Sequence, residues 1–162
     1  MHALRMLTLL LLAALSPVPA AADCLLCVCT ANTGNLNFGN YNPLSAAPLD
    51  DVATVRVRCS LAGTGVLPVL VSYDIGLSAG SSGSTNPREM RLDGERLLYN
   101  LYSDAARTQV WGEAGSSSQV TVSYGTALLG TWVQSDVYGR IFARQYPAPG
   151  RYTDSIVVTV SY

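Results

Sequence analysis

The stretch that decides the fold is GRYTDSIVVTVSY, residues 150–162. It opens with a turn signal and then alternates, so that Ile156, Val158, Val160 and Tyr162 fall on one side and mainly hydroxyl residues on the other. A period of two is typical of a β-strand with one buried face. The stretch therefore predicts a final strand whose four apolar side chains face the core.

The same alternation recurs upstream, over residues 53–59 with Cys59 on the inner side, and over residues 69–75. Residues 88–92 and 96–102 flank an Asp-Gly pair, which suits the positive φ angles of a tight hairpin turn. Further extended segments are predicted at residues 30–41, 110–112, 119–124 and 137–145. Residues 104–107 are expected to form one helical turn, and the Gly/Ser-rich residues 76–86 a flexible loop without chemistry. Short, regularly spaced strands with little helix indicate an all-β protein, a β-sandwich.

Residues 1–22 have the composition of a cleaved signal peptide. Arg5 precedes an apolar run, a Ser-Pro-Val-Pro break follows it, and three alanines offer a cleavage site. The run is much shorter than the ~20 residues that span a bilayer, so no membrane span is predicted. The mature protein is expected to be one exported domain, residues 23–162, which passes through the periplasm to the cell surface.

The charged residues exclude several functions. Cleavage would remove His2, the sole histidine of the sequence, and the chain has no lysine. Without histidine the mature chain cannot build a Ser-His-Asp relay or the usual zinc sites, so no catalytic residue, metal or cofactor is expected. Adjacent acids such as Asp50 and Asp51 are interpreted as solvated surface, and the near-neutral charge argues against a nucleic-acid partner.

All four cysteines, Cys24, Cys27, Cys29 and Cys59, lie near the predicted mature N-terminus. In an exported protein an even number indicates disulfides, and the sequence leaves all three pairings open. A redox or metal site at Cys24–Cys29 is the weaker interpretation, because no βαβ pattern surrounds the cluster.

From residue 29 onward the chain resembles the spore coat protein U domain family, the subunits of archaic chaperone–usher pili. The matching segments are CT at residues 29–30, LNFGNYNP at 36–43, VRVRC at 55–59, REMRL at 88–92, LLYNLYSD at 97–104, WG at 111–112, YGRI at 138–141 and PGRYTDSIVVTVSY at 149–162. No single motif is decisive, and the likeness rests on their order and spacing over nearly the whole mature chain.

This resemblance implies an immunoglobulin-like sandwich that lacks its last strand. A donor strand would fill a groove beside the final strand, with Ile156, Val158, Val160 and Tyr162 forming one wall. The implied partners are a periplasmic pilus chaperone, an outer-membrane usher and neighbouring pilus subunits. The family also pairs Cys29 with Cys59, which leaves Cys24 and Cys27 to each other.

One departure concerns the N-terminal extension that polymerising subunits donate. After the predicted cleavage site, residues 23–28 alone precede Cys29, and six extended residues reach at most ~20 Å. The sequence therefore predicts an acceptor that cannot donate a full strand, as at a fibre tip or in a coat. The alternative is a self-contained carbohydrate- or surface-binding module, in which Trp111, Trp132, Tyr138 or Tyr146 would stack on sugars, although burial of these aromatics is the simpler interpretation.

Overall fold

The computed structural model describes residues 27–61, 70–125 and 129–162. The predicted signal peptide and Cys24 lie outside this part of the chain.

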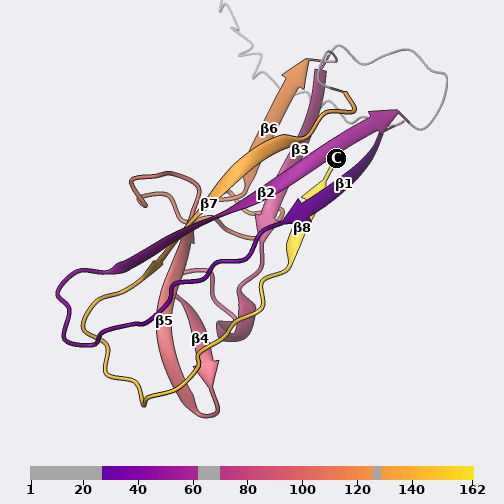
Figure 1. Cartoon of the computed structure of the whole chain (residues 1–162). Coiled ribbons are helices and arrows are strands. Elements are labelled where there is room, and N and C mark those ends of the chain that lie inside the picture. The colour runs from indigo at the N-terminus through magenta and orange to yellow at the C-terminus, as the bar shows by residue number, and fades with distance from the viewer. Residues whose placement is uncertain (1–26, 62–69, 126–128) are drawn as a thin grey trace, which may run out of the picture.

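The described residues form an all-β fold of two antiparallel sheets, as the alternation predicted (Figure 1). The strands are β1 (Cys27–Thr33), β2 (Leu49–Leu61), β3 (Leu70–Leu77), β4 (Arg88–Leu92), β5 (Glu95–Tyr102), β6 (Val120–Gly125), β7 (Val133–Ile141) and β8 (Val158–Ser161). Their order is β1-β2-β7-β5-β4 in the first sheet, sheet A, and β6-β3-β8 in the second, sheet B. A single 3-10 turn, η1 (Gly80–Ser82), follows β3.

The core lies between the sheets and uses the inner face of each strand. From β2 it takes Val55, Val57 and Cys59, each at most 2% exposed, while Arg56 and Arg58 point to solvent. Sheet B contributes the alternate residues of β3, among them Tyr73 and Ile75. Each fully buried side chain of this size stabilises the fold by ~1.5–3 kcal/mol, which is why the period-two pattern determines the sheets.

The predicted hairpin is confirmed. β4 and β5 pair with Leu92 opposite Glu95, so two residues form the turn. Asp93 has a φ of 52°, the left-handed conformation that Asp-Gly turns favour.

The final strand is shorter than predicted. Thr153 makes an isolated bridge with Arg91 of sheet A, whereas Val158 already pairs with Leu77 of sheet B. The chain has to cross from one sheet to the other between these positions, so a continuous strand cannot form. Tyr162 lies beyond the last paired residue and is 47% exposed, so the prediction that it faces the core was wrong.

The helical turn expected at residues 104–107 was also wrong. The Asp104 carboxylate accepts hydrogen bonds from the amides of Thr108 and Gln109, and Arg107 adopts a φ of 59°. A short polar side chain that captures nearby amides favours a turn over a helix. Likewise residues 110–112 make a single bridge, from Val110 to Tyr102, rather than a strand.

Candidate strand-binding groove

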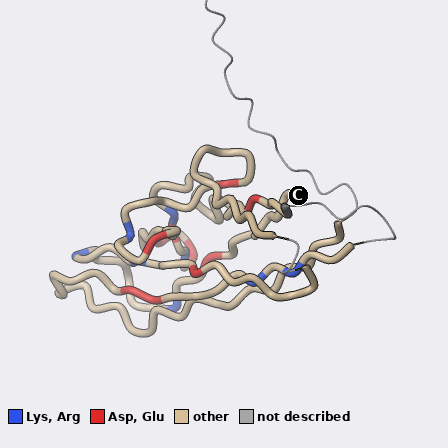
Figure 2. The backbone as a smooth tube through the Cα atoms, turned by 90° about the horizontal axis from the view of Figure 1, so that it is seen from above, with Lys and Arg blue, Asp and Glu red and all other residues tan. Residues whose placement is uncertain are grey.

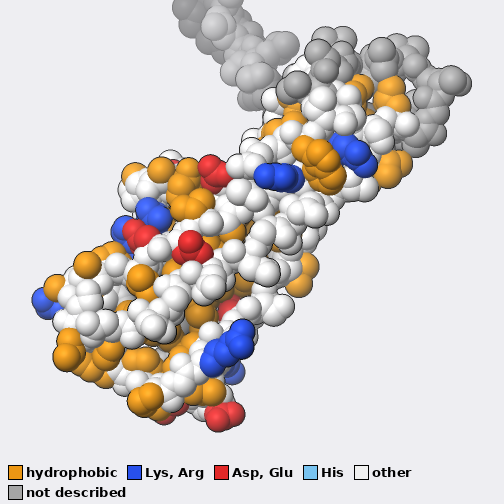
Figure 3. Space-filling view, viewed as in Figure 1, with side chains coloured by type: hydrophobic (Ala, Val, Ile, Leu, Met, Phe, Trp, Pro, Cys, Tyr) orange, Lys and Arg blue, Asp and Glu red, His pale blue; other side chains and the backbone are white. Residues whose placement is uncertain are grey.

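A groove of about 1130 Å³ runs along the open side of the sandwich. Two irregular segments border it, the N-terminal wall (residues 33–43) and the C-terminal wall (residues 147–158). In Figure 1 they are the indigo trace that follows β1 and the yellow trace that leads into β8. Core side chains from both sheets form its floor: Ala53, Val55, Leu77, Met90, Leu97, Tyr99, Leu101, Val137 and Ile141. On the face drawn in Figure 3, hydrophobic side chains gather over the half of the molecule where these segments run.

The N-terminal wall is attached to β2 at a few points. The amide of Gly34 donates to the Thr54 carbonyl over 2.8 Å, and the amide of Asn37 donates to Asp51 Oδ2 over 2.6 Å. Further along, the Tyr41 hydroxyl donates to the Phe142 carbonyl. These bonds fix the wall without making it a strand of sheet A.

A glycine allows this wall to approach the floor. A Cβ at Gly139 would lie 2.6 Å from Cζ of Phe38, closer than real contacts allow, and 3.0 Å from Cδ1 of Leu36, which is tighter than most contacts. Phe38 can therefore lie directly on β7, and its ring meets the Tyr99 ring edge-on at 6.3 Å. The alternation of Leu36 and Phe38 is the sequence signal from which this inward face could have been found.

The C-terminal wall is bonded on its side away from the groove. Arg91 and Thr153 exchange two backbone hydrogen bonds, of 2.9 and 3.2 Å. Ser78 binds Val157 twice, because its amide donates to the Val157 carbonyl and its hydroxyl accepts from the Val157 amide. Thr153 and Val157 of the wall are thus held by β4 and by Ser78, the residue that follows β3.

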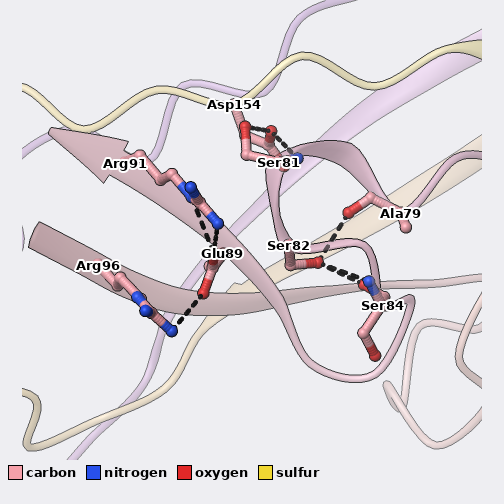
Figure 4. Close-up of polar contacts among 8 residues, drawn as sticks. All are labelled: Ala79, Ser81, Ser82, Ser84, Glu89, Arg91, Arg96 and Asp154. Atoms are coloured by element: carbon pink, nitrogen blue, oxygen red, sulfur yellow. Dashed lines mark hydrogen bonds and ion pairs between the residues drawn. The ribbon is translucent and has the colours of Figure 1, made fainter. Parts of the chain in front are cut away.

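Asp154 fastens the middle of the C-terminal wall (Figure 4). Its carboxylate accepts from the amide and the hydroxyl of Ser81 over 2.8 and 2.7 Å. It also accepts from the Tyr99 hydroxyl over 2.7 Å. Burial, together with this bond to a carboxylate, raises the pKa of Tyr99 above its ordinary value. Residues 76–86, predicted to be a flexible loop without chemistry, therefore have a structural role, because Ser81 of η1 binds the C-terminal wall through Asp154.

Arg88 is the buried cation beneath this support, and the sequence analysis did not single it out. Its side chain is fully buried, and burial lowers the pKa of the guanidinium. All its donor nitrogens are bonded: to the carbonyls of Ser78 at 2.9 Å, Thr85 at 3.1 Å, Leu77 at 2.9 Å and Trp111 at 2.8 Å, and to Asn100 Oδ1 at 3.1 Å. Arg88 thus holds Ser78, the residue that in turn holds Val157.

Both walls keep unpaired backbone groups. In the described part of the chain, no backbone hydrogen bond is made by Leu36 or Phe38 on one wall, or by Tyr152 or Ile156 on the other. Unpaired peptide groups beside an apolar floor are the two features that strand addition requires. The groove is also larger than the ~300–1,000 Å³ typical of small-molecule pockets.

The predicted groove residues separate into two pairs. Ile156 and Val158 line the groove. Val160 packs against the core, and Tyr162 is exposed; neither is among the lining residues.

The disulfide implied by the family resemblance is present between Cys29 and Cys59, which face each other across β1 and β2. Cys27 is also disulfide-bonded. Because Cys24 lies outside the described residues, its pairing with Cys27 stays a prediction.

The aromatics weighed as sugar platforms have different surroundings. Trp111 is 1% exposed and donates its indole N–H to the Ile75 carbonyl, so it is a core residue. Tyr138 is partly buried beneath Arg107, whereas Trp132 and Tyr146 are 46% and 74% exposed. Among the described residues no acids, cysteines or histidines gather in threes around a metal position, and no helix has the length and hydropathy to cross a membrane.

Comparison with known proteins identifies the family. The family model of the Spore Coat Protein U domain matches residues 16–159. A curated relative, Protein U of Myxococcus xanthus, is 31% identical over 139 residues, which cover 82% of this chain and 74% of the relative.

A solved structure shares the fold. It is the CsuC–CsuE chaperone–tip adhesion subunit pre-assembly complex from the archaic chaperone–usher Csu pili of Acinetobacter baumannii. The match has a TM-score of 0.50 and 21% identity, and it covers 85% of this chain but 40% of the other. The immunoglobulin-like class expected from the sequence is therefore confirmed. The matched family is described as that of a spore coat protein, a structural role, which agrees with the prediction that the chain is not an enzyme. The chain belongs to the Spore Coat Protein U domain family.

Proposed function

We propose that this chain is a structural or adhesive subunit of a chaperone–usher surface fibre or coat, and that its groove accepts a β-strand from a partner. The observation that carries the proposal is the pair of walls with unpaired backbone groups on either side of a core-lined floor. In transit the guest would come from a periplasmic chaperone. After export through an outer-membrane usher, it would come from a neighbouring subunit.

The geometry supports a strand rather than a compact ligand. Main-chain bonds to the walls would give affinity, and alternate apolar side chains would reach the floor. The floor residues are each at most 8% exposed, so the entering strand has to move the walls apart.

Two neighbouring valines of the C-terminal wall provide the test. Val158 lines the groove, whereas Val157 is 63% exposed. When the chain is co-expressed with the chaperone, Val158→Asp should abolish co-purification and Val157→Asp should preserve it. Equal capture of both variants would contradict the proposal.

A second measurement covers the case in which Val158→Asp does not fold. An alternating apolar strand fused after Tyr162 through a flexible linker should fill the groove of the same molecule, raise the melting temperature and prevent chaperone capture. A fusion with proline at every other position is the control, because proline cannot complete the backbone bonds. An unfused chain that is a stable monomer, unchanged by the fusion, would favour the self-contained binding module instead.

A further inference from the structure

A cationic–aromatic patch lies on the outer face of sheet A, on the side of that sheet away from the core. It consists of Arg56 and Arg58 from β2, Gln134 from β7, and Trp132 just before β7. Arg56 pairs in register with Gln134, and Trp132 continues that register toward Arg58. On the upper part of the face in Figure 3, basic side chains lie on both sides of hydrophobic ones, over β1, β2 and β7.

The Arg58 guanidinium lies 5.0 Å from the centre of the Trp132 ring. Stacking of this kind orients a guanidinium and leaves its in-plane N–H groups free to bind. Arg58 makes no side-chain hydrogen bond or ion pair within the described ranges. Arg56 uses one nitrogen, Nε, to donate to Gln134 Oε1 over 3.2 Å.

Within the described ranges, no carboxylate forms an ion pair with these two arginines. Every ion pair among the described residues involves Arg91, Arg96, Arg107 or Arg140. Asp136, two residues after Gln134 on β7, accepts a hydrogen bond from the Gln134 side-chain amide. Residues 62–69 and 126–128, which adjoin β2 and β7 in sequence, contain no acidic residue. Figure 2 shows that charged positions elsewhere in the molecule are few and of both signs.

We propose that this patch binds an acidic polysaccharide, with uronate carboxylates on Arg56 and Arg58 and a sugar ring against Trp132. Paired N–H groups of arginine match the two oxygens of a carboxylate. The C–H face of a pyranose packs on the electron-rich face of an indole, and Trp132 remains 46% exposed. The arginines are two residues apart on one strand, ~7 Å. They therefore present two separate anion sites to one polymer.

Other polyanions fit this patch less well. Nucleic-acid binding draws on many phosphate contacts, commonly about 6–10, and the patch has two cations. Each arginine would contribute ~1 kcal/mol to the free energy of binding to an anionic membrane. The patch has no large apolar surface that could insert into the bilayer. Because the patch faces away from the core, this inference is independent of the groove.

Tryptophan fluorescence reads the site directly, because Trp111 is buried and Trp132 is exposed. A hexamer of galacturonate, added to the purified full chain, should change the emission saturably, while uncharged maltohexaose should not. Arg58→Gln should weaken binding about tenfold, the loss of one charge-assisted pair. Arg96→Gln, an exposed arginine of β5, should leave the affinity within about twofold.

Calorimetry of Trp132→Phe provides a readout that does not depend on the fluorophore, and it should show weakened binding. Raised salt should weaken binding of the wild type, since the contacts are exposed charges. Equal affinity for maltohexaose, or equal losses in the Arg58 and Arg96 variants, would overturn the proposal. Tighter binding of duplex DNA or phosphatidylglycerol vesicles through the same arginines would overturn the assignment to a polysaccharide.

Discussion

Replacing Arg88 with methionine should destabilise the domain more than replacing any exposed arginine. Methionine fills a similar space but provides no N–H group. Three of the five bonds of Arg88 are fully buried, those to Leu77, Trp111 and Asn100. A buried acceptor that loses its partner costs ~1–3 kcal/mol.

A second effect of Arg88→Met stabilises the fold and partly offsets the lost hydrogen bonds. The substitution removes a desolvated cation, which costs several kcal/mol to keep buried. Three buried acceptors at ~1–3 kcal/mol each would cost ~3–9 kcal/mol, and relief of the desolvation offsets several kcal/mol of this. The net loss expected for Arg88→Met is therefore about 2–4 kcal/mol, a large part of the ~5–15 kcal/mol that holds a typical domain together. For a chain of this length the melting temperature should fall by about 5–15 °C.

Urea unfolding measures this loss in a Trp132→Phe background, where Trp111 alone reports. Arg96→Met is the matched control and should change the stability by less than ~0.5 kcal/mol. Arg88→Lys should recover a minor part of the loss, since an ammonium cannot reach five acceptors in a plane. If Arg88→Met unfolds within ~1 kcal/mol of the wild type, desolvation cancels the bonds and Arg88 does not anchor the wall.

Three further predictions follow from single contacts. Replacing Cys29 and Cys59 together by alanine should lower the free energy of unfolding in urea by ~3–4 kcal/mol, because their disulfide closes a loop of sequence separation 30. An unchanged free energy of unfolding would show that this disulfide does not stabilise the fold. Gly139→Ala should cost about 1–3 kcal/mol, and Phe38→Ala should relieve part of it in a double-mutant cycle; additive losses would show that the two do not touch. Burial raises the pKa of Tyr73 to about 12, so its contribution to stability should be full below about pH 10 and decline as the pH rises toward 12. Tyr73→Phe should make this decline shallower in pH-dependent unfolding curves and leave the part due to Tyr99, whose pKa is also raised; an unchanged decline would contradict the prediction.

The sequence predicted the strands where one side of the alternation is buried. Residues 53–59 satisfy the pattern and form the centre of β2, and the Asp-Gly pair fixes the hairpin locally. Both signals are local. A half-buried strand requires apolar side chains at every second residue, and a tight turn requires residues that accept a positive φ. The predictions at residues 104–107 and 150–157 were wrong because side-chain capture of amides and a crossing between sheets override local propensity.

The groove could be predicted only in part. Ile156 and Val158 were identified from their alternation, but the floor and the opposite wall come from strands far away in sequence. Tyr99 and Asp154 are 55 positions apart. Four of the five bonds of Arg88 go to backbone carbonyls, which carry no sequence signature.

The sequence alone therefore determined the all-β class and the inner face of most strands, because burial of alternate side chains is a one-dimensional pattern. The tertiary structure decided which edges stay open, since hydrogen bonds between distant segments close one side of each wall and leave the other unpaired. It also decided the exposed patch, because Arg58 and Trp132 become neighbours only when β2 and β7 pair.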